Sequence, residues 1–486
     1  MEPWDDYNIH DKKSVLKHAA KLTKKTLNEI LGTCGFDIVG GINSKGKFGQ
    51  IIEEGYFLID NNNRHEADFA DLSIELKTHP MIKKEKKMLV AKERLSLGII
   101  NYMEADEENF DTFSKKNSHL LLVFYMWTPK TSIFDYRFLK VVDWTPSPVE
   151  LQMIHEDWNV IYHFIHNGEA HLLSERYTKI LAANRKGAGH DKDLRCQPHS
   201  NIPAKQRSLS FKTKFMTTMY YSNPNIGEKL NKQTEKYEPI FEGPWNEDTD
   251  FESAVLLRLQ KFVGMTGYEI EAELDINLNP IAKQYYKNLC NNMMGAHGKK
   301  DVKELMEADI SMKTIRIRLD GKPKECMSFS YFKYKDIAEE KWEDSDFISQ
   351  IDCRFLFPIF SFNTNKPDKE KDRKALVFTG AFFWALPEKE FAMAREIWED
   401  TKQKTIEERI EDYIPKSGHP VFHVRTHGKK KTDTDQYMDK EYTKRCFWIN
   451  DTYLKSVVTE ELYGPHSTKM KKKSASYTQT YLKTHD

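Results

Sequence analysis

The chain has 486 residues, of which 39% are hydrophobic, so it is long enough for two or three domains with substantial cores. Its 74 basic residues balance 74 acidic ones, so a nucleic-acid partner would depend on where the charges lie. No apolar run of about 18 residues is present to span a membrane. Six scattered cysteines without a CxxC pair favour a reducing, cytoplasmic setting and argue against a disulfide framework.

The first half of the chain alternates between helical and strand patterns. The apolar spacing of residues 11–31 predicts an amphipathic helix, and residues 48–57 predict a second one. Alternating, β-branched and aromatic stretches then predict four strands, and a long helix is expected to start near Pro148. The predicted strands are 72–77, 94–102, 119–127 and 136–144.

The second half repeats the first. Residues 114–125 align with 349–360 without a gap, and each stretch is followed by a strand, a proline and a helix containing Glu-x-Trp. Residues 226–250 are polar, with Pro and Gly turns typical of a linker. We therefore predict tandem α/β domains at 1–225 and 251–486, each with a mixed central sheet flanked by helices, and a basic C-terminal tail.

The stretch ADFADLSIELKTHP, residues 67–80, carries the candidate chemistry. Residues two apart in a strand share a face, so Glu75 and Lys77 project together, and Asp68 is far enough upstream to meet them. Two converging carboxylates favour Mg²⁺, and a neighbouring lysine can position the attacking water or stabilise charge on phosphorus. The alternative is an edge strand with mixed charges, because this spacing alone is common.

Two other motifs are alternative candidates for a functional site. GINSKGK, residues 41–47, matches a phosphate-binding loop, but Phe48 replaces the Ser or Thr that would hold Mg²⁺. His423 and His427 are four residues apart, yet their segment is predicted as a strand or loop and not as a helix that would pair them on a metal.

The sequence SKGKFGQIIEEGYF followed by ADFADLSIELKTHP resembles the signature of the MutH-like endonucleases. The similarity is greater to GATC-specific type II restriction enzymes of the Sau-three-A type, which carry two MutH-like halves, than to MutH itself. The matching positions are Lys45, Gly46, Gly49, Glu53, Asp68, Phe69, Glu75, Leu76, Lys77, Thr78 and Pro80.

This resemblance implies roles for residues of the first half. Asp68 and Glu75 would hold Mg²⁺, for which Mn²⁺ can substitute, with the Leu76 carbonyl as a further ligand. Lys77 would activate the attacking water. Glu53 would assist at the metal, and Lys116 matches a further active-site lysine.

The resemblance also implies residues that contact double-stranded DNA at GATC. Arg195 and Gln197, in LRCQPH, are candidates to read bases, although Arg195 is also compatible with a phosphate contact or a surface salt bridge. Ser210 stands where MutH has a tyrosine linked to sensing adenine methylation. Lys212 and Lys214 are expected to contact phosphates.

The second half has lost chemistry at the matching positions. Ser311 replaces Glu75, Glu304 aligns with Asp68, and Ile351 aligns with Lys116, although Lys313 is kept. We predict that this half does not cut. It is either a structural partner or an effector domain that binds DNA through Arg425 and the basic cluster after it.

The resemblance therefore implies a metal-dependent type II restriction endonuclease. With one cutting half, cleavage of both strands would require either a homodimer formed on DNA or two successive nicks. A mismatch-repair-type nickase and a catalytically idle, sequence-specific DNA-binding protein are the alternatives. No membrane partner is expected.

Overall fold

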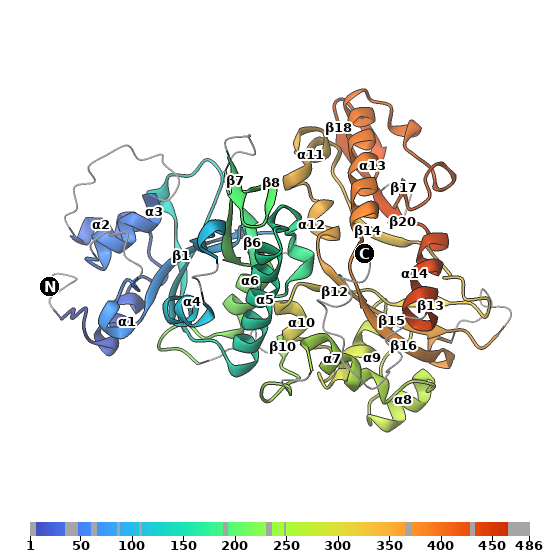
Figure 1. Cartoon of the computed structure of the whole chain (residues 1–486), viewed down its shortest axis with the longest axis horizontal. Coiled ribbons are helices and arrows are strands. Elements are labelled where there is room, and N and C mark those ends of the chain that lie inside the picture. The colour runs from blue at the N-terminus through green and yellow to red at the C-terminus, as the bar shows by residue number, and fades with distance from the viewer. Residues whose placement is uncertain are drawn as a thin grey trace. The chain divides into compact units, whose positions relative to one another are not determined.

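The chain folds into two compact units in a computed structural model (Figure 1). The first unit comprises Met1–Pro244 and Asp301–Asp309, and the second comprises Trp245–Lys300 and Ile310–Asp486. The structure describes residues 6–34, 47–59, 66–84, 88–105, 109–187, 193–229, 236–246, 249–364, 372–427 and 433–464. The phosphate-loop match before Lys47, Lys45 and Gly46, the lysines at 429–431 and the C-terminal basic tail lie outside these ranges.

The first unit is built on two mixed or antiparallel sheets and a hairpin. One sheet has the order β2-β1-β4-β5, in which β1 and β4 run parallel, and the other has the order β3-β9-β6. Strands β7 and β8 form the hairpin, and β10 pairs with β11. The strands are β1 (Glu75–Lys83), β2 (Leu89–Ala91), β3 (Leu95–Ile99), β4 (Leu120–Met126), β5 (Phe138–Trp144), β6 (Leu181–Arg185), β7 (Leu194–Gln197), β8 (Ser200–Lys205), β9 (Arg207–Phe211), β10 (Tyr237–Glu238) and β11 (Asp301–Val302).

Helices cover these sheets. The longest of them in this unit, α5, starts with a capping box in which Ser147 and Glu150 bond each other's backbone N–H groups. The α-helices are α1 (Lys12–Ala20), α2 (Leu27–Cys34), α3 (Lys47–Gln50), α4 (Phe110–Asn117), α5 (Pro148–His166), α6 (Thr213–Ser222) and α10 (Lys303–Glu307). The short helical turns are η1 (Ile51–Tyr56), η2 (Ala70–Leu72), η3 (Tyr102–Glu104), η4 (Ile133–Asp135), η5 (Ala170–Leu172) and η6 (Glu175–Tyr177).

Two of the predicted elements differ in the structure. The single helix predicted over residues 11–31 is wrong, because the chain breaks between α1 and α2 at Lys24, whose φ is +70°. The break lets the N–H of Lys24 donate to the carbonyl of Phe138, so pairing with β5 outweighs helical periodicity. The strand predicted from residue 72 begins instead at Glu75, after a left-handed turn at Ser73.

The second unit repeats this plan. Strands β12 and β13 both run parallel to β15, which also pairs with antiparallel β16, and a second sheet has the order β14-β20-β17. The strands are β12 (Ile310–Met312), β13 (Ile315–Ile317), β14 (Met327–Tyr331), β15 (Arg354–Ser361), β16 (Val377–Trp384), β17 (Phe422–Thr426), β18 (Thr434–Tyr437), β19 (Lys440–Thr443) and β20 (Arg445–Ile449).

The helices of the second unit follow the same order as those of the first. Its α-helices are α7 (Phe251–Gln260), α8 (Gly267–Glu273), α9 (Tyr285–Met294), α11 (Tyr334–Glu339), α12 (Ile348–Ile351), α13 (Glu388–Ile406) and α14 (Asp451–Tyr463). Its 3-10 turns are η9 (Trp342–Asp344), η10 (Arg373–Ala375), η11 (Ile410–Asp412) and η12 (Lys416–Gly418). Among the helices of both units that the structure describes, none is long and apolar enough to cross a membrane.

Strand registers show that the two units are copies of one plan. Leu120 on β4 lies opposite Trp144, and Phe355 on β15 lies opposite Trp384. The long helices α5 and α13 both have 19 residues and follow these tryptophans. The predicted α/β fold and tandem duplication are therefore confirmed.

A short segment of the second half of the sequence packs in the first unit. Strand β11 pairs in parallel with β10, and α10 contacts α6. The buried carboxylate of Glu304 accepts hydrogen bonds from the N–H groups of Ile240 and Phe241. The chain therefore passes between the two units three times. The sequence analysis predicted only a linker followed by a second domain in this region.

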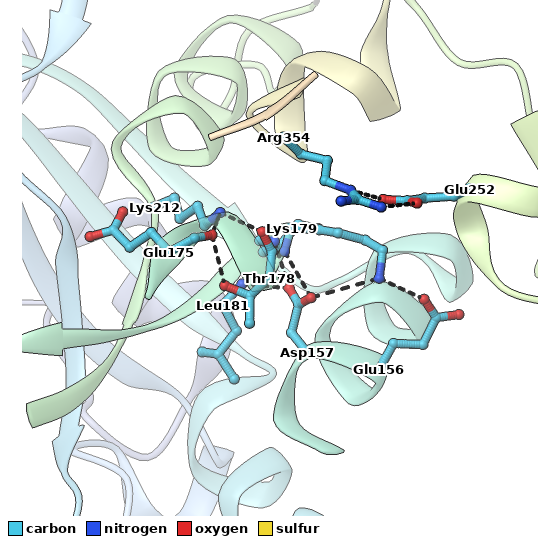
Figure 2. A network of polar contacts seen from close by, with 10 residues as sticks. Glu156, Asp157, Glu175, Thr178, Lys179, Leu181, Lys212, Glu252 and Arg354 are labelled. Atoms are coloured by element: carbon cyan, nitrogen blue, oxygen red, sulfur yellow. Dashed lines mark hydrogen bonds and ion pairs between the residues drawn. The ribbon is translucent and has the colours of Figure 1, made fainter. Parts of the chain in front are cut away.

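A buried carboxylate fastens α5 to the start of β6 (Figure 2). Asp157 has no exposed surface, and it accepts hydrogen bonds from the N–H groups of Lys179, Ile180 and Leu181 at 2.6–2.9 Å. The three bonds fix where the β-strand leaves the preceding loop, and the Lys179 ammonium lies 3.8 Å away as a counter-charge.

We predict that Asp157→Ala destabilises the first unit by about 3 kcal/mol, because three buried N–H groups would lose their acceptor. Hydrogen exchange of the amides at 179–181 should accelerate. The neighbouring Glu156→Ala removes only a partly exposed partner of Lys179 and should cost about 1 kcal/mol or less. Equal exchange rates in both variants would contradict the assigned anchor.

His79 on β1 gives the first unit a dependence on pH. Its ring is buried against Phe124, and burial lowers its pKa to about 3. The folded unit therefore holds His79 neutral, whereas the unfolded chain takes up a proton below about pH 6.5.

The stability that depends on neutral His79 is present above pH 6.5 and is lost as the pH falls toward 3, by about 2 kcal/mol at pH 5. Urea unfolding of the first unit, followed at pH 7 and pH 5, measures this loss. The difference in the free energy of unfolding between pH 7 and pH 5 should shrink in His79→Gln and persist in the exposed control His155→Gln. An unchanged difference in His79→Gln would refute the role of His79 in the pH dependence.

Candidate active site and its DNA-facing residues

The five predicted catalytic residues come together at the start of β1. Glu75 and Lys77 lie on one face of β1, Lys116 comes from the last turn of α4, and Glu53 comes from η1. Asp68 precedes η2 and reaches the same point. Parallel pairing sets this arrangement, because Glu75 lies opposite Leu120, directly after α4.

Glu75 is the central group of the site. It is only 2% exposed, and its Oε1 atom lies 2.5 Å from Lys77 Nζ and 3.8 Å from Lys116 Nζ. Its Oε2 atom accepts the N–H of Asp68 at 3.3 Å. Both lysines keep part of their surface exposed, so their ammonium groups are available to a phosphate while the carboxylate is held from behind.

Asp68 is positioned by the strand itself. Its Oδ2 atom accepts the N–H of Leu76 at 2.8 Å, so the residue between Glu75 and Lys77 fixes the second carboxylate. The Leu76 side chain is fully buried in the core on the opposite face of β1. Packing of Leu76 therefore anchors the strand that carries the polar residues.

Glu53 approaches the site from a π-helical turn. A π-turn is frequent at functional sites because it redirects side chains from the regular helical spacing. The helical segment that carries Gly49 and Glu53 packs closely against β1. A Cβ placed on Gly49 would lie 3.3 Å from Thr78 Oγ1 on β1 and 3.9 Å from Glu53 Oε1. The close approach of α3 to β1 therefore explains the glycine at position 49. The sequence pattern did not predict this approach.

The electrostatics of the site suit a bound cation. Burial raises the pKa of Glu53, and the charges of Asp68 and Glu75 raise it further. Burial and the charge of Glu75 likewise raise the pKa of Asp68, against the opposing effects of Lys77, the Leu76 N–H and Lys116. Carboxylates crowded in this way gain from a divalent cation, which favours their ionised forms.

The donor set consists of oxygen atoms, as a hard cation requires. Among the residues that the structure describes, no three or more His, Cys, Asp or Glu side chains form a ready-made metal cluster. The predicted ligands are two carboxylates, Asp68 and Glu75, with the main-chain carbonyl of Leu76. They fit Mg²⁺ chemically, with Glu75 here turned toward its lysines.

The predicted DNA-facing residues divide into exposed and buried groups. Arg195 is exposed on the β7–β8 hairpin, where its guanidinium donates to the carbonyl of Leu194 and to Gln206. Lys214 is exposed on α6, and Arg425 is exposed on β17. All three side chains are exposed, as a contact with DNA would require.

Gln197, Ser210 and Lys212 are buried, and their surroundings argue against the predicted direct contacts. Gln197 is 4% exposed, and its amide bonds the N–H of Ala170 and the carbonyl of Ile202, which holds the hairpin. The Ser210 hydroxyl bonds that of Ser208 inside the β3-β9-β6 sheet.

Lys212 corrects the expected phosphate contact most clearly. It is 2% exposed, and its ammonium donates to the carbonyls of Glu175 and Thr178 (Figure 2). In the second unit the equivalent Asn450 makes the same kind of tie, with its side-chain amide donating to the carbonyls of His419 and Pro420. A shared structural role explains both residues.

The second unit has a serine at the position of Glu75. Ser311 lies opposite Phe355 in the register that places Glu75 opposite Leu120, so it occupies the position of Glu75. Glu304, the residue aligned with Asp68, lies in the first unit and bonds backbone N–H groups there. Lys313 is retained, at the interruption between β12 and β13.

Known proteins resemble the chain in both halves. Residues 57–157 and 293–396 match the family model described as the DNA mismatch repair enzyme MutH. The type II restriction enzyme Sau3AI of Staphylococcus aureus is 28% identical over 504 aligned positions, which cover 91% of this chain and 99% of that protein.

MutH proteins match a smaller part. The DNA mismatch repair protein MutH of Shewanella amazonensis is 24% identical over 37% of this chain and 80% of its own length. MutH of Yersinia enterocolitica is 23% identical over 37% of this chain and 77% of its own length. The chain is therefore similar to MutH in two tandem segments and to a type II restriction enzyme over nearly its whole length.

Proposed function

We propose that the protein is a type II restriction endonuclease that hydrolyses double-stranded DNA at GATC with Mg²⁺, for which Mn²⁺ can substitute. The observation that carries this proposal is the convergence of Asp68, Glu75, Lys77 and Lys116 on one point in the first unit. The near full-length similarity to a type II restriction enzyme supports it.

Each residue of the site would have a separate role in phosphodiester hydrolysis. Asp68, Glu75 and the Leu76 carbonyl would hold Mg²⁺, which supplies Lewis-acid polarisation of the scissile phosphate. Lys77 would orient the attacking water and help to remove its proton. Lys116 would neutralise the charge that develops on the phosphate oxygens. Glu53 would tune the charge of the site from the adjoining turn.

The water oxygen would form a bond to phosphorus in line with the bond that breaks to the 3′ oxygen. The displaced 3′ oxygen takes up a proton, and the product ends are a 3′-hydroxyl and a 5′-phosphate. Cleavage on the 5′ side of the guanine follows from the family resemblance.

DNA reading would rest on the exposed hairpin of the first unit. The guanidinium of Arg195 can meet O6 and N7 of guanine with two hydrogen bonds. The exposed Lys214 would contact phosphate and hold the register.

We propose that the second unit binds a further DNA site as a non-cutting effector. Ser311 removes a predicted metal ligand, whereas Arg425 is exposed and would contact DNA. Because one chain then has one cutting site, cleavage of both strands requires a homodimer on DNA or two successive nicks.

A mismatch-repair-type nickase is the second candidate. It is favoured because, among the residues that the structure describes, the predicted catalytic residues come together in the first unit alone, and because part of the chain is similar to MutH proteins. Nicked circles that never become linear would identify the nickase, whereas a discrete ladder of GATC fragments identifies the restriction enzyme.

Substitutions at the site separate catalysis from binding. With Mg²⁺ and GATC plasmid, Glu75→Ala should lower cleavage by at least about 10³-fold, and Lys116→Ala by about 10²-fold, because each removes stabilisation that acts on the transition state. Gel shifts should show that DNA binding survives. Lys115→Ala, one position away on the exposed face of α4, is the matched control and should cut normally. Full activity of Glu75→Ala would refute the proposal.

The effector role predicts a dependence on site number. A plasmid with two GATC sites should be cut at least several-fold faster than a plasmid with one, and added GATC duplex should accelerate the one-site reaction. Initial rates of linear product formation test this expectation. Equal rates, unchanged by the added duplex, would remove the effector role from the second unit.

A further inference from the structure

A tryptophan in the second unit replaces a small residue of the first. Trp448 on β20 lies opposite Ser328 and His423, just as Ser210 on β9 lies opposite Ser96 and Ala182. Trp448 therefore occupies the position of Ser210. Where the first unit has hydroxyls buried in the sheet, the second has a broad aromatic face.

Two basic side chains lie against this ring. The guanidinium of Arg425 is 3.8 Å from the Trp448 ring centroid, and the His427 ring centroid is 5.6 Å from it. Arg425 is exposed, so stacking fixes the plane of its guanidinium while leaving donor groups toward solvent. An ordered guanidinium loses less conformational freedom when it binds an anion.

Lys313, between β12 and β13, bonds the strand that pairs with Trp448. Its Nζ atom donates to the carbonyl of Ser328 at 3.4 Å, and Ser328 is the residue opposite Trp448. Lys313 is the counterpart of the catalytic Lys77, whose ammonium instead binds the carboxylate of Glu75. With Ser311 at the carboxylate position, Lys313 has lost that anionic partner.

The local balance of charge is positive. Burial lowers the pKa of His427, and the nearby charges of Lys283, Lys313 and Arg425 lower it further. Burial likewise lowers the pKa of Lys313, against the raising effects of Cys353 and Cys446, and Lys283 acts in the same direction as burial. The acid that opposes these effects at His427 is Asp433, which is already paired with Lys444 at 2.8 Å.

We propose that Lys313, which bonds the strand opposite Trp448, and Arg425, which stacks on Trp448, form a metal-independent site for a DNA phosphodiester in the second unit. In the proposed mechanism, the first unit binds a phosphate through a metal cation that its carboxylates hold. Here the carboxylates are gone, and the protein's own cations supply the positive charge. Guanidinium and ammonium groups bind phosphate oxyanions through charge-assisted hydrogen bonds. The inference rests on the proposed effector role and names the residues that would carry it.

The test measures binding to full-length protein in EDTA, with a short GATC duplex and a range of salt concentrations. Wild-type protein should bind two duplexes per chain. The double variant Lys313→Met with Arg425→Gln should weaken the second binding event by at least tenfold, and the slope of log affinity against log salt should fall by about two.

Lys440→Gln is the matched control, because it removes an exposed charge of the same unit that is paired with Glu408. It should leave both binding events intact. Arg425→Lys, which keeps the charge but not the planar fork, should weaken the second event less than Arg425→Gln does, and it serves as the readout if the double variant unfolds. Equal loss in Lys440→Gln, or no loss in the double variant and in Arg425→Gln, would overturn the site.

Inorganic phosphate at matched ionic strength distinguishes the source of the ligand. If it binds wild-type protein and not the double variant while duplex binding is the same in both, the site serves a free anion and the DNA assignment fails. Plasmid cleavage with Mg²⁺ is measured separately. If wild-type protein does not cut the plasmid but the binding differences are observed, the proposed nuclease is refuted and this site stands. If wild-type protein cuts normally but the binding differences are absent, only this site is refuted.

Discussion

The parallel pairing of β1 with β4 is the constraint on which the candidate active site depends. The N–H of Glu75 donates to the carbonyl of His119 at 2.9 Å, and this bond starts a register that runs along both strands. The register places Glu75 beside the end of α4 and so beside Lys116. A slip of one residue would turn Glu75 and Lys77 into the apolar core and bring Leu76 out. Burial of Leu76 is therefore as important to the site as the charges are.

The same pairing recurs in the second unit without the chemistry. Strand β12 pairs with β15 in the equivalent register, and the turn before each first strand contains a left-handed residue, Ser73 or Asp309. The backbone plan therefore does not require the metal ligands. Ser311 stands at the position of Glu75, and Glu304, aligned with Asp68, bonds the N–H groups of Ile240 and Phe241. A scaffold of this kind persists because its packing is independent of the site that it carries.

Buried ions in this protein serve as anchors as well as reactive groups. Asp157 and Lys212 both bond backbone groups around the start of β6, and neither reaches solvent. Lys212 lies two residues from exposed Lys214 in a basic segment, so composition alone gives both lysines the same interpretation. Only the path of the loop from Glu175 to Thr178 distinguishes them, because that loop supplies the carbonyl groups that surround the Lys212 ammonium.

Strand alternation and motif spacing are local properties of the chain, so the amino-acid sequence alone predicted the α/β class, the tandem repeat and the meeting of Asp68, Glu75 and Lys77, whereas Glu53 and Lys116 were expected from the family resemblance. The sequence did not determine that Lys24 breaks the first helix, that Gln197, Ser210 and Lys212 are buried, or that residues 301–309 pack with the first unit. Nor did it single out Trp448, whose importance follows from its place opposite Ser328. Each of these depends on which distant strand or carbonyl lies beside a residue. Burial and partnership are set by tertiary packing, and the local pattern contains no record of them.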